Sequence, residues 1–124
     1  MGYESRLFVV RKNGRCFDDE YEWAENIAMF NMCCIGGVLL SRICENPVTN
    51  CRFSNGFGGT VSKDAYGTPL REIPLHRMVE ILEEIIMTDS DYRRFAPLFA
   101  MLKVFDADNE SKWNNELVVL HYGY

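Results

Sequence analysis

A helix-spaced run of apolar residues is the feature that most constrains this chain. In the segment PLHRMVEILEEIIMTDS, large apolar side chains recur at intervals of three and four residues. They are Leu75, Met78, Val79, Leu82, Ile85 and Ile86. This spacing predicts an amphipathic helix with one face in a hydrophobic core, and Pro74 suits its first turn. The polar face carries His76, Arg77, Glu80, Glu83 and Glu84.

Both ends of the chain have the composition of buried strands. SRLFVVRK near the N-terminus and ELVVLHYGY at the C-terminus are rich in β-branched and aromatic residues, and each is apolar on both faces. Strands of this kind lie at the centre of a sheet that is covered on both sides. CRFS and TVS predict two shorter strands.

The segment 20–35 fits two structures. Trp23, Ile27, Phe30 and Cys34 fit a helical stripe, whereas a strand here would form a hairpin with the first strand. The strand is favoured, and the helix remains open. The following GGVLLSRICENP predicts a short helix that ends at ENP.

The segment DSDYRRFAPLFAMLKVF predicts a second helical region. Asp89 or Ser90 can cap it, and Pro97 interrupts it, so a kink or two short pieces are expected. From Leu98 to Phe105 it is apolar nearly all round, which indicates either a deeply buried helix or a homodimer interface.

Together these elements predict one α+β domain over residues 1–124. We expect a mostly antiparallel sheet with two to three helices packed on one face and the N- and C-terminal strands in its centre. A chain of 124 residues with 48% hydrophobic and 25% charged residues has ordinary globular composition.

The charge pattern bears on the kind of partner that the protein can bind. The net charge is −5, which disfavours nonspecific nucleic-acid binding but permits docking on a basic protein. A local run of five acidic residues forms the candidate partner-binding surface: Glu80, Glu83, Glu84, Asp89 and Asp91. No apolar run approaches the roughly 20 residues of a membrane span, and no secretory signal is seen, so we expect a cytoplasmic protein.

The five cysteines predict no disulfide framework and no metal site. The count is odd, and no C-x-x-C pair is present for structural zinc. We interpret the cysteines as small apolar core residues and expect no metal and no cofactor.

A glycine-rich stretch, NGFGGT, raises the alternative of a phosphate-binding loop. Its glycines are Gly56, Gly58 and Gly59. Phosphate loops follow a strand and open a helix, whereas this stretch lies between two predicted strands, so a hairpin tip is favoured. If the loop does contact a ligand, the guanidinium groups of Arg93 and Arg94 and the phenol of Tyr122 are the candidate side chains for a nucleotide.

The histidines suggest no catalytic site. His76 falls on the polar helix face and His121 in the last strand, where a core or edge histidine with a partner is expected. Adjacent carboxylates such as Glu83 and Glu84 point in different directions on a helix. We therefore predict that the protein is not an enzyme.

Three stretches, MGYESRLFVV, YRRFAPL and LVVLHYGY, carry a resemblance to a group of small, mostly uncharacterised proteins of tailed phages and prophages of Gram-positive bacteria. That group has no defining catalytic motif. The resemblance implies a phage accessory product acting in the host cytoplasm, and small acidic phage proteins often inhibit host defence, as anti-CRISPR proteins do.

Three hypotheses follow. The first is a non-enzymatic inhibitor that binds a host protein, such as a defence nuclease, through its acidic surface. The second is a sponge for a signalling nucleotide, and the third is a structural or housekeeping phage protein.

Overall fold

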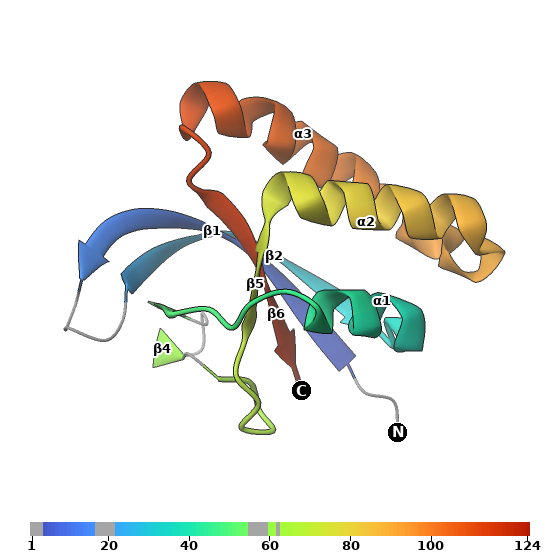
Figure 1. Ribbon diagram of the computed structural model, residues 1–124, viewed down its shortest axis with the longest axis horizontal. Coiled ribbons are helices and arrows are strands. Elements are labelled where there is room, and N and C mark those ends of the chain that lie inside the picture. The colour runs from blue at the N-terminus through green and yellow to red at the C-terminus, as the bar shows by residue number, and fades with distance from the viewer. Residues whose placement is uncertain (1–3, 17–21, 55–59, 62) are drawn as a thin grey trace.

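The first and last strands lie side by side at the centre of one sheet. The computed structural model describes residues 4–16, 22–54, 60–61 and 63–124 (Figure 1). β1 (Glu4–Cys16) pairs antiparallel with β6 (Leu117–Gly123), and the order across the sheet is β4-β3-β2-β1-β6-β5. The predicted central position of both terminal strands is therefore confirmed.

The other strands extend the sheet on both sides. β2 (Glu22–Cys33) pairs antiparallel with β1, which confirms the strand interpretation of this segment, and β5 (Arg71–Pro74) pairs antiparallel with β6. β3 (Cys51–Ser54) joins the start of β2 in parallel, and β4 (Thr60–Val61) pairs antiparallel with β3. The sheet is mostly antiparallel, as expected, with one parallel contact.

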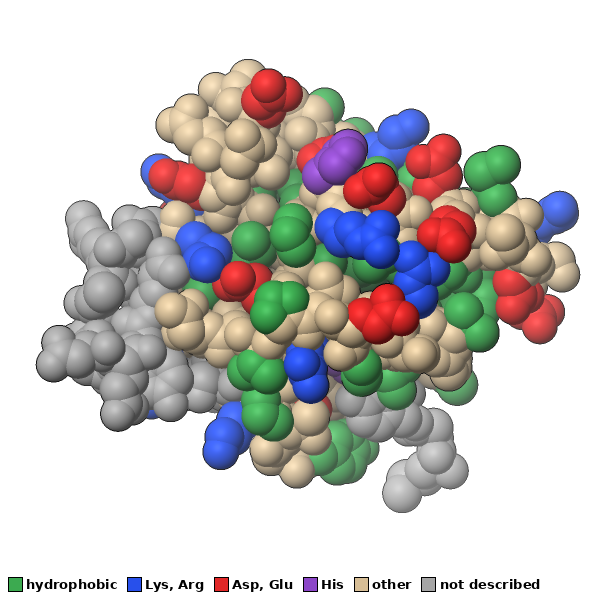
Figure 2. Space-filling model, in the orientation of Figure 1, with side chains coloured by type: hydrophobic (Ala, Val, Ile, Leu, Met, Phe, Trp, Pro, Cys, Tyr) green, Lys and Arg blue, Asp and Glu red, His purple; other side chains and the backbone are tan. Residues whose placement is uncertain are grey.

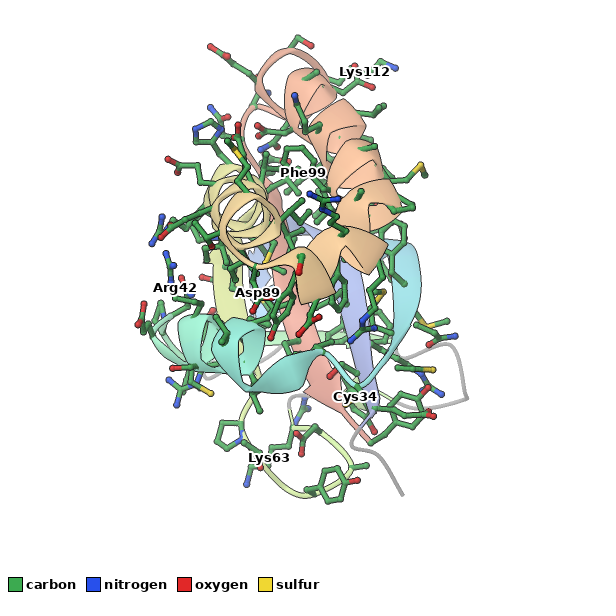
Figure 3. All side chains as sticks on the ribbon, turned by 90° about the vertical axis from the view of Figure 1, so that its right-hand side faces the viewer. Cys34, Arg42, Lys63, Asp89, Phe99 and Lys112 are labelled. Carbon is green, nitrogen blue, oxygen red and sulfur yellow. The ribbon has the colours of Figure 1, made fainter. Side chains whose placement is uncertain are left out.

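The helices cover one face of this sheet (Figure 3). They are α1 (Gly36–Cys44), α2 (Leu75–Thr88), the 3-10 helix η1 (Ser90–Phe95) and α3 (Ala96–Lys112). Leu39, Leu82 and Leu102 from the three α-helices share a core with Leu7 and Val9 of β1. The α+β architecture predicted from the sequence is confirmed.

A second, smaller core covers the opposite face. Phe8 and Val10 point there because side chains alternate along β1. Phe8 meets the ring of Phe53 from β3 with 4.8 Å between ring centroids, and Leu120 of β6 joins them. Both central strands are thus buried on two faces, which explains their unbroken apolar sequence.

The helix α2 follows the predicted stripe. Leu75, Met78, Val79, Leu82 and Ile85 are buried, while the charged residues between them are exposed. Each such side chain contributes roughly 1.5–3 kcal/mol when it leaves water. α2 is therefore held rigidly by its inner face and presents a fixed polar outer face.

The helical region predicted after Asp89 forms two separate pieces and not one kinked helix: the 6-residue η1 and the 17-residue α3. The Asp89 carboxylate accepts a hydrogen bond from the Asp91 N–H at 3.0 Å and caps η1. Pro97 then stands in the first turn of α3, where its missing N–H costs nothing. Along α3, Leu98 and Leu102 are buried, whereas Met101 and Val104 are 49% and 63% exposed. The apolar segment Leu98–Phe105 is therefore buried on one side only.

The expectation that the cysteines are core residues is wrong for three of them. Cys33, Cys34 and Cys44 are exposed, and of the described thiols only Cys51 is buried. Cys33 and Cys34 lie where the chain leaves β2 for α1, and Cys44 ends α1, so their surroundings are open. Burial raises the pKa of the Cys51 thiol to about 11.

Candidate functional site

The outer face of α2 carries three of the predicted partner-binding residues. Glu80, Glu83 and Glu84 are all exposed. Arg42 of α1 donates from Nη2 to Glu84 Oε2 at 3.2 Å, and this hydrogen bond lowers the pKa of Glu84. Figure 2 shows basic and acidic side chains alternating over this face. The surface therefore carries more acidic than basic side chains, but it is not a patch of negative charge alone.

A second ion pair borders the same face. His76 Nδ1 lies 2.9 Å from Asp106 Oδ2, which links α2 to α3, and Glu80 Oε1 is 3.9 Å from the other ring nitrogen. The hydrogen bond with Asp106 raises the pKa of His76. The predicted exposed histidine is thus confirmed, and in its protonated form it partly offsets the charge of Glu80.

The two aspartates after α2 have different surroundings. Asp89 is half-buried and serves as the cap of η1, whereas Asp91 is exposed. Among the described residues, Glu83 and Asp91 make no ion pair. These two carboxylates are therefore the most available members of the predicted surface.

The residues of the alternative nucleotide site are not brought together. Arg94 donates to the backbone carbonyls of Cys33 and Cys34, and its guanidinium lies 4.3 Å from the Phe95 ring centroid. Arg93, also in η1, is exposed on the helix side of the sheet. Tyr122 packs on Phe8 across the opposite face, with 6.2 Å between ring centroids.

The glycines of the same prediction, Gly56, Gly58 and Gly59, lie outside the described residues. The strands on either side of them do pair, with Phe53 opposite Val61 and Ser54 opposite Thr60. This antiparallel pairing agrees with the predicted strands that flank a hairpin.

A cavity between α1 and the β5–β6 side of the sheet was not foreseen. It has a volume of about 220 Å³. Its lining is Leu40, Ile43, Cys44, Asp64, Thr68, Pro69, Arg71 and His121. A thiol, a carboxylate, a guanidinium and an imidazole thus meet in one hollow, although they come from four separate segments of the chain.

The imidazole of this cavity is neutral at physiological pH. His121 is buried, and its Nε2 lies 2.8 Å from the Ser5 hydroxyl oxygen. Burial lowers the pKa of His121 to about 4, and the negative charge of Asp64 opposes that shift. Arg71 donates from Nη1 to the Asn46 carbonyl at 2.9 Å. The predicted core histidine with a partner is confirmed.

A larger groove lies between β2 and the start of α3. Its volume is about 350 Å³. Its walls are Met29, Phe30, Asn31, Met32, Arg94, Pro97, Leu98 and Met101. Methionine-rich apolar grooves adapt to protein surfaces, so this one has the character of a docking site. The sequence indicated it only through the apolar segment Leu98–Phe105.

The described residues include no group of three or more potential ligands that could hold a metal ion. Nor does any helix among them have the length and apolar character needed to traverse a bilayer. No family model, curated protein or solved structure matches the chain.

Proposed function

We propose that this chain is a non-enzymatic accessory protein that binds and inhibits a host protein, as its resemblance to small phage proteins suggests. The observation that carries the proposal is the outer face of α2, where Glu80 and Glu83 stand exposed on a helix fixed by six buried side chains. A rigid charged helix face is suited to docking because little conformational entropy is lost on binding.

The acidic balance of this face favours a basic partner, such as the nucleic-acid groove of a defence nuclease. Charge of opposite sign raises the association rate and selects the partner more than it raises affinity. Glu80, Glu83 and Asp91 are the residues expected to act, because Glu84 already pairs with Arg42 and Asp89 caps η1.

The test compares charge removal on α2 with the same charge removal elsewhere. Tagged wild-type protein is used to isolate its partner from the bacterial host, and binding kinetics are then measured. We expect Glu80→Gln/Glu83→Gln to slow association about tenfold at low salt, and Asp91→Asn to add to this. The matched control Asp108→Asn/Glu110→Gln removes two charges from α3 and should leave association unchanged. Equal rates for both double variants would reject the α2 face as the docking surface.

A small-ligand sponge is the second candidate, and the cavity beneath α1 is the observation that favours it. Arg71 and the neutral His121 offer polar contacts within a largely apolar hollow, which is the usual composition of a ligand pocket. Thermal-shift measurements with a panel of nucleotides separate the candidates. A rise of several degrees that Arg71→Ala abolishes supports the sponge.

A further inference from the structure

The outer side of β2 is a strand edge over much of its length. β3 pairs only with Glu22 and Trp23, at the start of β2. Beyond them, the part of the chain that the structure describes places no strand along the side of β2 that faces away from β1. A strand edge of this kind is a template for another strand.

Register decides which backbone groups point outward. Glu4 and Tyr124 exchange both backbone hydrogen bonds, at 3.2 and 3.0 Å. Such pairs recur at every second residue of an antiparallel ladder. The backbone N–H and C=O groups of even-numbered residues in β1 therefore point toward β6, and those of odd-numbered residues point toward β2. Leu7 is odd-numbered and stands opposite Phe30. The neighbours Met29 and Asn31 therefore direct their N–H and C=O groups outward.

The usual protections of a strand edge are missing from Ala28–Met32. The segment contains no lysine and no proline, and the one bulge of this region lies before it, at Ile27. At the far end Arg94 donates to the Cys33 carbonyl at 2.9 Å and so closes the edge there. What remains is a short edge beside the methionine-rich groove.

We propose that two copies of this chain pair antiparallel through this edge, about a twofold axis at Phe30, so that one sheet runs through both. The axis sets Met29 opposite Asn31 of the partner subunit, and both residues carry outward backbone groups. It also sets Ala28 opposite Met32 of the partner subunit. Ala28, Phe30 and Met32 all pack toward the helix side, so the faces of the two sheets match as well.

Charge favours a second copy as the occupant. Glu25, which is 4.0 Å from Arg11 but keeps 57% of its side chain exposed, lies toward one end of the edge, and the guanidinium of Arg94 lies at the other. Antiparallel pairing of identical edges brings each glutamate toward Arg94 of the partner subunit. Parallel pairing would place like charges together, which is unfavourable.

The exposed side of α3 supports the same arrangement. Pro97, Met101 and Val104 recur at helical spacing, and Pro97 and Met101 also line the groove beside β2. Joining the two sheets at β2 brings the two α3 helices toward each other across the twofold axis. The apolar side chains left open on α3 would then be covered, which accounts for an apolar segment with only one buried side.

Sedimentation equilibrium of the purified chain is the first test. We expect a mass twice the 14.4 kDa of one chain at about 10 μM, and a monomer at about 100 μM would overturn the proposal. Asn31→Pro removes an outward N–H without breaking the β1–β2 ladder and should weaken dimerisation at least about tenfold. Met101→Glu should also weaken dimerisation, because it brings the negative charges of the two α3 helices toward each other across the twofold axis. Met87→Glu, at a residue 79% exposed at the end of α2, is the matched control.

Cross-linking tests the register. In a background with Cys33 and Cys34 replaced by serine, Ala28→Cys/Met32→Cys should form an intersubunit disulfide on oxidation, because non-hydrogen-bonded pairs have close Cβ atoms. Ala28→Cys alone should not. A dimer that survives both Asn31→Pro and Met101→Glu, or that cross-links equally through the single variant, would reject the β2 interface. Neither result depends on binding to a host protein.

Discussion

The last strand is tied to the first by a buried hydrogen bond between His121 Nε2 and Ser5 Oγ, which are 2.8 Å apart. Because burial lowers the pKa of His121 to about 4, the native state holds fewer protons on this residue than the unfolded state between about pH 4 and pH 6.5. Stability therefore falls as the pH decreases from about 6.5 toward 4. We expect the contribution of His121 to the free energy of unfolding in urea to be about 2 kcal/mol smaller at pH 5 than at pH 7.5.

The variant His121→Gln isolates this contribution. It removes the titrating group while keeping a polar side chain beside Ser5, so the part of the pH dependence due to His121 should disappear. If the wild type and His121→Gln lose the same stability between pH 7.5 and 5, the assignment to His121 is wrong.

The second histidine titrates in the opposite direction. The hydrogen bond with Asp106 raises the pKa of His76, so its stabilising contribution is complete below pH 6.5 and is lost as the pH rises through the folded-state pKa. Since the chain has two histidines, their ring signals are separable by NMR. We expect one midpoint above 6.5 and one near 4. Asp106→Asn should move only the higher midpoint, downward.

The four thiols whose side chains the structure describes should divide into two classes by exposure. Cys33, Cys34 and Cys44 are open to solvent, whereas Cys51 is buried and its pKa of about 11 leaves almost no thiolate at neutral pH. With a thiol reagent at pH 7.5, peptide mapping should show fast labelling of the first three. Labelling of Cys51 should require unfolding in urea, and its rapid labelling in the native protein would contradict the described packing.

The sequence predicted the elements whose pattern has a single physical explanation. The apolar spacing of Leu75–Ile86 admits only a helix with one buried face, and the two-sided apolar runs at the chain ends require central strands. Segment 20–35 was ambiguous because the bulge at Ile27 interrupts the alternation that marks a strand. The segment Leu98–Phe105 of α3 is apolar nearly all round, so its sequence does not indicate which side of the helix is exposed.

The candidate sites were harder to predict because distant segments create them. Cys44, Asp64 and His121 share a cavity only through the packing of α1 on the β5–β6 side of the sheet. The exposure of single residues also depends on tertiary structure. Cys33 and Cys34, for example, are exposed because they lie where the chain leaves β2 for α1. The carboxylates of α2 were predicted as exposed, but the pairing of Glu84 with Arg42 depends on where α1 lies.

The turn from β2 into α1 depends on the absence of a side chain at Gly36. Its φ of +81° lies in the left-handed region that disfavours other residues, and a Cβ there would collide with the Tyr92 hydroxyl. That hydroxyl accepts a hydrogen bond from the Leu39 N–H at 3.4 Å, so its displacement also disturbs the first turn of α1. We expect Gly36→Ala to lower the free energy of unfolding by about 1–3 kcal/mol.

Gly37→Ala is the matched control, because nothing lies within 4 Å of its Cβ position. In a helix, alanine there should be neutral or stabilise by up to about 1 kcal/mol. Urea unfolding of both variants at pH 7.5 provides the comparison, and an equal effect of the two substitutions would contradict the described contact with Tyr92.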